Sequence, residues 1–238
     1  MNALDNLKVK IYADGADRDG MLEMYAKSYI QGFTTNPTLM KKAGITDYKA
    51  FAHEILQAIP DRPISFEVFA DEFEDMERQA LEIKTWGENV YVKIPVSNTR
   101  QETAYDLIAR LSGAGVHLNV TAILTLEQVQ NVADALKDGP ESIVSVFAGR
   151  IADTGLDPVP VMQEALILLK VAPKAELLWA SPREVLNIYQ ADNIGCHIIT
   201  ATNDLLRKLA LGGKDLAEYS LETVQMFYDD AQSAGYTL

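Results

Sequence analysis

The sequence contains one cysteine and three histidines in 238 residues. Cys196 has no partner for an internal disulfide, and it lies in an apolar run, Cys196 to Ile199, which is typical of a buried, unreactive thiol. The histidines, His53, His117 and His197, are far apart and match none of the common metal-ligand spacings. We therefore expect no disulfide, no metal and no metal-dependent chemistry.

Long apolar stretches and an excess of basic residues are also missing. No run approaches the roughly 20 residues that cross a bilayer, and Met1 to Lys10 does not resemble a secretory signal. The 21 Lys and Arg residues against 34 Asp and Glu residues give a formal charge of −13. This balance disfavours nonspecific binding to nucleic acid or to an anionic membrane. We expect a cytoplasmic protein in which any anionic substrate needs a local cationic pocket.

The sequence does contain a regular alternation of two kinds of segment. Apolar residues recur at helical spacing in several stretches, as at Phe73, Met76, Ala80 and Ile83, and Thr125 to Gln128 has the pattern of a helix capping box. Between such stretches lie short apolar runs that read as strands. These runs are residues 9–12, 32–35, 64–69, 90–96, 118–124, 143–147, 177–179 and 198–201.

Eight such strand-helix units, each of about 25 to 30 residues, predict a closed (β/α)8 TIM barrel. No linker or change of composition divides the chain, so we expect a single domain over residues 1–238. An open doubly wound sheet is the alternative fold. No GxGxxG or GxxxxGK[ST] loop follows any predicted strand, so the usual nucleotide-binding signature of that alternative is missing.

Polar residues interrupt several of the predicted strands at alternate positions. In the run from Val90 to Ile94, the apolar residues suit the helix-facing side, which leaves Tyr91 and Lys93 pointing into the barrel. We expect Tyr91 to pack in the core. The same period of two directs other polar side chains inward, all near the carboxyl ends of strands, where barrel enzymes have their active sites. These residues are Asp14, Glu67, Asn119 and Thr121.

A single lysine in a strand is more often a solvated edge residue, and a single inward glutamate is more often its structural ion-pair partner. A lysine surrounded by two carboxylates and an amide is a more specific pattern. Burial of an amine favours its neutral, nucleophilic form. Lys93 with Asp14, Glu67 and Asn119 therefore indicates Schiff-base chemistry.

Two later strands are each followed by an arginine, Arg150 and Arg183, and the second also by Ser181. The guanidinium fork suits phosphate oxygens, and barrels often bind phosphate at their last strands. The alternative is that both arginines form ordinary surface ion pairs, which contribute little.

Five motifs in this order resemble the transaldolase family of class I aldolases, in its short form, almost from end to end. The motifs are Gly32 to Thr38, Val92 to Pro95, Asn119 to Thr121, Phe147 to Arg150 and Ala180 to Arg183. The resemblance implies a (β/α)8 barrel with the Schiff base on Lys93, Asp14 as acid/base and Glu67 acting through a water. It implies no metal or organic cofactor. The remaining roles that it implies are binding of donor or water by Thr34, Asn36, Asn119, Thr121 and Ser145, and of phosphate by Arg150, Ser181 and Arg183.

The family contains both sugar transferases and fructose-6-phosphate-type aldolases. The aldolase branch typically has Gln and Tyr where this chain has Glu67 and Phe147, so the resemblance favours the transferase. A phenol could help to protonate the enamine and end the reaction, whereas Phe147 has no such donor. We expect transfer of a dihydroxyacetone unit between sugar phosphates of the sedoheptulose 7-phosphate and fructose 6-phosphate type, as in the pentose phosphate pathway. A simple aldolase and a non-catalytic sugar-phosphate-binding protein are the alternatives.

The last segment predicts an amphipathic helix from Ser220, with Leu221, Val224, Phe227, Tyr228 and Ala231 on one face. That face could pack on its own barrel or on a neighbour. Since short members of the family are often ring-shaped oligomers, the resemblance implies a homo-oligomer.

Overall fold

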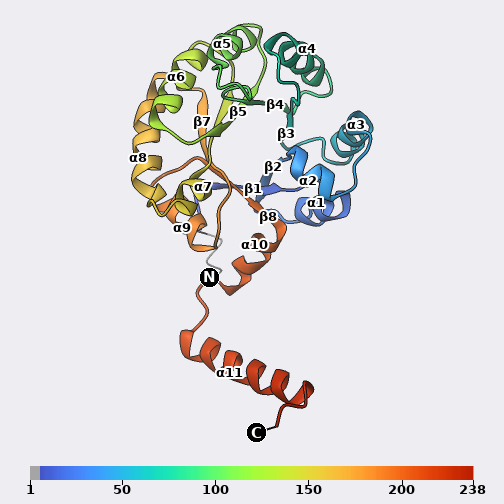
Figure 1. The fold of residues 1–238 in the computed structure, drawn as a ribbon, viewed down its shortest axis with the longest axis vertical. Helices are drawn as coiled ribbons and strands as arrows, with labels where there is room; N and C mark the ends of the chain where they lie inside the picture. Colours follow the sequence, from blue (N-terminus) through green and yellow to red (C-terminus); the bar gives the residue numbers. More distant parts are fainter. Residues whose placement is uncertain (1–5, 238) are drawn as a thin grey trace.

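The computed structural model describes residues 6–237, in which eight parallel strands close into a barrel in sequence order (Figure 1). Strand β8 pairs with β1 and closes the sheet. This confirms the predicted TIM barrel. The predicted domain 1–238 and the segment Met1 to Lys10 include residues outside the described range. The strands are β1 Lys10–Asp14, β2 Ile30–Thr34, β3 Ile64–Glu67, β4 Val90–Pro95, β5 Leu118–Ile123, β6 Ser142–Val146, β7 Ala175–Trp179 and β8 Ile198–Thr202.

Helices surround the barrel and follow the strands (Figure 1). The predicted capping box is present at the start of α6, where Thr125 accepts from the backbone N–H of Gln128 and the Gln128 side chain accepts from that of Thr125. The helices are α1 Arg18–Tyr25, α2 Pro37–Lys42, α3 Tyr48–Ala58, α4 Phe73–Lys84, α5 Tyr105–Gly113, α6 Leu126–Leu136, α7 Ala148–Asp153, α8 Pro158–Leu168, α9 Leu186–Asn193, α10 Asn203–Arg207 and α11 Leu216–Ser233.

The hydrophobic core has two parts, as the alternation along the strands requires. The larger part joins outward strand residues, such as Val92 and Ile94, with buried residues of the surrounding helices. The smaller part fills the barrel interior, where Tyr12, Leu178 and Ile198 are buried. Tyr91 packs at the edge of the smaller part, as expected. The polar inward positions lie above this interior core.

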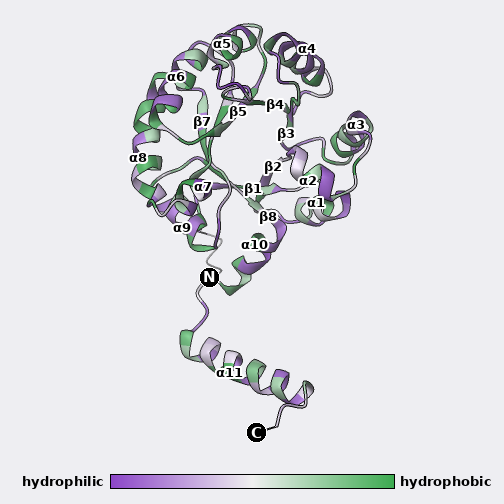
Figure 2. Ribbon diagram, viewed as in Figure 1, coloured by the Kyte–Doolittle hydropathy of each residue, from purple (hydrophilic) through white to green (hydrophobic). Residues whose placement is uncertain are grey.

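Helix α11 departs from the sequence prediction and from the rest of the fold. It begins at Leu216 rather than Ser220, because Asp215 caps it by accepting from the N–H groups of Ala217 and Glu218. The helix stands away from the barrel (Figure 1), and none of its residues is buried. Hydrophobic residues nevertheless recur along it (Figure 2). Within residues 6–237, no helix combines the length and apolar character needed to cross a membrane.

Candidate active site

A cavity of about 510 Å3 opens at the carboxyl ends of the strands. This is the end of a TIM barrel at which active sites are built. Eleven of the twelve site residues predicted from the sequence line it, and the twelfth, Asn119, lies below it in the barrel interior. The eleven are Asp14, Thr34, Asn36, Glu67, Lys93, Thr121, Ser145, Phe147, Arg150, Ser181 and Arg183.

Lys93 lies at the centre of this group because of the strand register. In the sheet, Glu67 on β3 pairs with Lys93 on β4, and Lys93 pairs with Asn119 on β5. The side chain of Lys93 is buried, with the residue only 7% exposed. Its amine lies 3.2 Å from Oε2 of Glu67 and donates to the carbonyl oxygen of Thr35 at 3.0 Å. A buried amine needs such partners, and the two oxygens fix its position.

Asp14 ends β1 on the other side of the cavity. The hydroxyl of Thr34 donates to its Oδ1 at 2.8 Å and lies 2.6 Å from the hydroxyl of Thr200. Burial raises the pKa of Asp14 above its usual range, while the positive charge of Lys93 and the hydrogen bond from Thr34 act in the opposite direction. The carboxyl group of Asp14 therefore holds a proton more readily than an exposed aspartate does, as suits a group that accepts and returns a proton.

A chain of hydrogen bonds holds the polar residues below the cavity. The hydroxyl of Ser145 donates to Oδ1 of Asn119 at 2.6 Å, and Nδ2 of Asn119 donates to the hydroxyl of Ser65 at 2.9 Å. The hydroxyl of Thr121 is buried and has no hydrogen-bond partner among residues 6–237. Thr121 precedes Ala122, whose φ of 63° is in the left-handed region where the β5–β6 register shifts. The unused hydroxyl of Thr121 can therefore bind a substrate or a water.

Asn36 has a structural role besides its place at the cavity. Its Oδ1 caps helix α2 by accepting from the N–H of Leu39 at 3.0 Å, so only its amide N–H groups are left for a ligand. Phe147 precedes α7 and presents no hydrogen-bonding group. The guanidinium of Arg150 lies 5.4 Å from the centre of the Phe147 ring, within the range of a cation–π contact.

The residues predicted to bind phosphate come together where α7 meets the segment after β7. The backbone of Gly149 packs so closely on Ser181 that an added Cβ would lie 1.5 Å from the Ser181 carbonyl oxygen. Ser181 has a φ of 62°, which is uncommon for a residue other than glycine. Arg183 follows and pairs with Asp153 at the end of α7. Arg183 therefore forms a surface ion pair and also lines the cavity.

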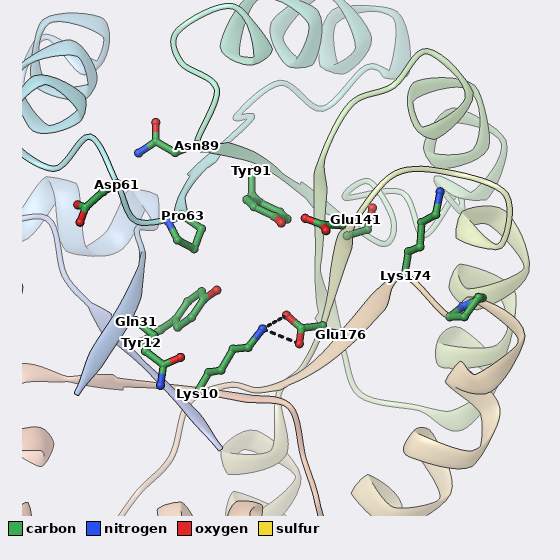
Figure 3. A pocket seen from close by; sticks show the side chains of 12 residues that line it. Lys10, Tyr12, Gln31, Asp61, Pro63, Asn89, Tyr91, Glu141, Lys174 and Glu176 are labelled. Atoms are coloured by element: carbon green, nitrogen blue, oxygen red, sulfur yellow. Dashed lines mark hydrogen bonds and ion pairs between the residues drawn. The ribbon is translucent and has the colours of Figure 1, made fainter. Parts of the chain in front are cut away.

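A second cavity, of about 630 Å3, lies at the amino-terminal ends of the strands (Figure 3). Tyr12 and Tyr91 line it, together with Lys10 and Glu176. The amine of Lys10 is 2.8 Å from both carboxylate oxygens of Glu176, as the dashed lines in Figure 3 show. This lysine is committed to an ion pair at the end of the barrel that usually serves stability. We therefore place the chemistry at the carboxyl ends.

Ser65, Thr200 and Thr35 form hydrogen bonds with predicted site residues but were not themselves predicted from the sequence. Ser65 has the same parity as Glu67 on β3, so the period of two could have identified it. Thr200 is a polar residue between Ile199 and Ala201 on β8 and could have been found in the same way. Thr35 contributes its backbone carbonyl, which no side-chain pattern reveals.

The chain is similar to known proteins over nearly the whole barrel. The sequence profile described as Transaldolase/Fructose-6-phosphate aldolase matches residues 11–238. A probable transaldolase of Dehalococcoides mccartyi is 31% identical over 202 residues, which cover 84% of this chain and 90% of that protein. A probable transaldolase of Methanococcus maripaludis is 33% identical, covering 84% and 89%.

Two solved structures resemble this chain in fold. They are a 3-keto-L-gulonate-6-phosphate decarboxylase from Vibrio cholerae, with a TM-score of 0.54, and a putative phosphonomutase from Burkholderia cenocepacia, with a TM-score of 0.55. The first covers 86% of this chain and 97% of its own, and the second covers 96% and 97%. At 14% identity each, they show a shared architecture and carry no information about the substrate.

Proposed function

Because the chain belongs to the transaldolase/fructose-6-phosphate aldolase family, we propose that it is a transaldolase that transfers a dihydroxyacetone unit between sugar phosphates. The observation that carries this proposal is the buried amine of Lys93, held 3.2 Å from Glu67 in the cavity at the carboxyl ends of the strands. The names of the two relatives, both probable transaldolases, support the same activity. In this proposal the chain acts as one barrel domain without a cofactor.

The first half of the reaction forms the Schiff base. Glu67 first accepts a proton from the ammonium of Lys93, and the neutral amine then attacks the ketone carbon of a phosphorylated ketose to give a carbinolamine. Glu67, acting through a water bound with Thr121, supplies the proton with which the carbinolamine oxygen leaves as water. The product is an iminium, in which the former carbonyl carbon is bonded to the nitrogen of Lys93. The 3.2 Å distance between Nζ of Lys93 and Oε2 of Glu67 supports the assignment of Glu67 as the proton donor.

The second half breaks and reforms a carbon-carbon bond. Asp14 accepts the proton of the β-hydroxyl, the adjacent carbon-carbon bond breaks, and its electron pair moves into the iminium to give an enamine. The departing fragment is an aldose phosphate. An acceptor aldose phosphate then reverses these steps, and Asp14 returns the proton. The hydroxyl of Ser145, oriented by its 2.6 Å hydrogen bond to Asn119, would accept a hydrogen bond from a hydroxyl of the dihydroxyacetone unit, and Asn119 would act through Ser145.

The phosphate groups of donor and acceptor would be bound by Arg150, Ser181 and Arg183. Two arginines on the cavity wall give an acidic protein the local positive charge that an anionic substrate needs. Because Oδ1 of Asn36 caps α2, the side-chain N–H groups of Asn36 are assigned to a hydroxyl of the sugar.

A simple aldolase, which would release free dihydroxyacetone, is the second candidate because it needs the same imine. Phe147 favours transfer, since a hydrocarbon ring at the cavity wall cannot protonate the enamine. A sugar-phosphate-binding protein without activity would need none of the contacts that fix Lys93. The family includes both activities by its own description.

Product analysis separates these candidates. With sedoheptulose 7-phosphate and glyceraldehyde 3-phosphate, we expect erythrose 4-phosphate and fructose 6-phosphate in equal amounts. With fructose 6-phosphate alone, we expect no steady release of dihydroxyacetone. Steady release without an acceptor would establish the aldolase instead. Unchanged sugar-phosphate binding by Lys93→Met, with no turnover in either protein, would establish the binding protein.

We also propose that the protein is a homo-oligomer in which α11 packs on another copy. The helix buries none of its residues on its own barrel, although Leu221, Val224, Phe227 and Tyr228 are all at least 60% exposed. An apolar face of this extent is costly to leave in water. A neighbouring subunit would cover it.

A further inference from the structure

Arg183, which the proposed function assigns to phosphate, is held along one edge of its guanidinium by Asp153. Nε of Arg183 donates to Oδ1 of Asp153 at 2.9 Å, and Nη2 donates to Oδ2. The backbone N–H of Arg183 donates to Oδ1 of Asn187 at 2.7 Å, so the main chain is anchored as well. Arg183 is thus restrained at both ends of its side chain.

Helix α7 contains both Arg150, the first proposed phosphate ligand, and Asp153, which holds Arg183. Arg150 and Asp153 are three residues apart on α7 and therefore lie on neighbouring positions of one side of the helix. The hydrogen bond from Arg183 and the charges of both arginines lower the pKa of Asp153, which is consequently a carboxylate at neutral pH. One short helix thereby supplies a first arginine and fixes the second.

We propose that Asp153 is a positioning residue for phosphate, acting through Arg183. A guanidinium has two edges that can each form a paired hydrogen bond. Asp153 occupies the edge formed by Nε and Nη2, which leaves the edge formed by Nη1 and Nη2 for two phosphate oxygens. The inference rests on the proposed phosphate role of Arg183, and it adds a residue that touches no substrate.

Two simpler views of Asp153 lead to different expectations. As an ordinary surface ion pair, with side chains 47% and 52% exposed, the contact would contribute little and its loss would change nothing. As a mere negative charge beside the phosphate, Asp153 would repel the ligand, and its removal would tighten binding. Only a positioning role predicts that removal of a negative charge weakens the binding of an anion.

The test measures the dissociation constant of inorganic phosphate by calorimetry, at constant ionic strength and in the absence of any sugar. We expect Asp153→Ala to weaken phosphate binding about fivefold, the scale of one ordinary net hydrogen bond. Asp153→Asn keeps one acceptor oxygen and should recover part of this loss. In an Arg183→Ala background, Asp153→Ala should have no further effect. Glu77→Gln, which removes the partner of Arg110 in another surface ion pair, is the matched control and should bind as wild type does.

A kinetic measurement completes the test. With an acceptor aldose phosphate held at a fixed, saturating concentration, Asp153→Ala should raise KM for fructose 6-phosphate about fivefold with kcat unchanged, and should leave KM for unphosphorylated fructose as it was. Equal or tighter phosphate binding by Asp153→Ala would overturn the inference while leaving the proposed function intact. A wild-type protein that binds no phosphate would also overturn it. Because phosphate binding requires no turnover, failure of the Schiff-base mechanism would be seen separately, as a lack of activity with phosphate binding retained.

Discussion

At Asp14, burial and the neighbouring polar groups have opposite effects on the pKa of the carboxyl group. Burial raises its pKa, and the charge of Lys93 and the hydrogen bond from Thr34 oppose this effect without cancelling it. A carboxyl whose pKa is higher in the folded state contributes most to stability at acid pH, and that contribution is lost as the pH rises through the folded-state pKa. The ionised form that accepts a proton is therefore the form that destabilises the fold.

Replacing Asp14 with Asn should separate these two effects. We expect Asp14→Asn to lower kcat at least about 100-fold, since the acid/base group is lost. The same variant should be more stable than wild type at pH 7, and this advantage should shrink toward about pH 4, where a folded carboxyl of raised pKa is protonated. Denaturant unfolding at the two pH values measures the difference. An advantage that is equal at both, or absent at pH 7, would contradict the assignment.

Phe147 provides a second prediction at the residue scale. Phe147→Tyr adds a phenol to the cavity wall, so we expect free dihydroxyacetone to be released from fructose 6-phosphate without an acceptor, and transfer to fall. The control is Phe147→Leu, which removes the ring without adding a proton donor and should not increase release. Dihydroxyacetone is measured enzymatically over many turnovers. Equal release of dihydroxyacetone by both variants would contradict the prediction, because it would show that the added phenol is not the cause.

At the scale of elements, α7 and the segment after β7 are in close backbone contact beside the site. Gly149→Ala would place a Cβ 1.5 Å from the Ser181 carbonyl oxygen, and neither backbone can move without shifting Arg150 or Arg183. We expect a loss of about 1 to 3 kcal/mol in the free energy of unfolding and a higher KM for sugar phosphates. Gly113→Ala, at the end of α5 with no heavy atom within 4 Å, is the control and should be tolerated. Equal stability of the two variants would show that the contact is not restrictive.

The sequence predicted the elements well because the strands of a barrel impose a strict period of two. Each predicted strand was found within about two residues of its predicted bounds. The prediction for β3 ran to Phe69, whereas the strand ends at Glu67 and Phe69 is 65% exposed in the following loop. A hydrophobic residue beyond the last pairing residue cannot be distinguished from a strand residue by composition. The start of α11 was missed for a related reason, because apolar spacing does not show which residue caps a helix.

Residues of the candidate site could be predicted where the position of a polar side chain within its own strand shows that it points inward. Lys93 and Glu67 share a parity and a position near the strand end, so the sequence alone brought them together. The partners that depend on contacts between segments distant in sequence could not be predicted. The carbonyl of Thr35 and the pairing of Asp153 with Arg183 join residues far apart in sequence through contacts that no local pattern encodes.

At the scale of the whole molecule, α11 is a helix whose apolar residues are not covered by its own barrel. Its exposed apolar residues predict that the protein migrates as an oligomer in size-exclusion chromatography with light scattering. Phe227→Asp places a charge in the apolar face and should shift the protein toward a monomer. Ser233→Asp adds a charge to the same helix on the side opposite that face and should not. A wild-type monomer at micromolar concentration would contradict the proposed assembly.

The central claim is a covalent intermediate on Lys93, and the most direct measurement is intact mass after incubation with fructose 6-phosphate and borohydride, which reduces an imine to a stable amine. We predict an adduct of one dihydroxyacetone unit, mapped to Lys93 by peptide analysis and absent from Lys93→Met. Lys10→Met, which removes the amine at the opposite end of the barrel, should still form it. No adduct with any ketose phosphate, or the same adduct in Lys93→Met, would contradict the mechanism.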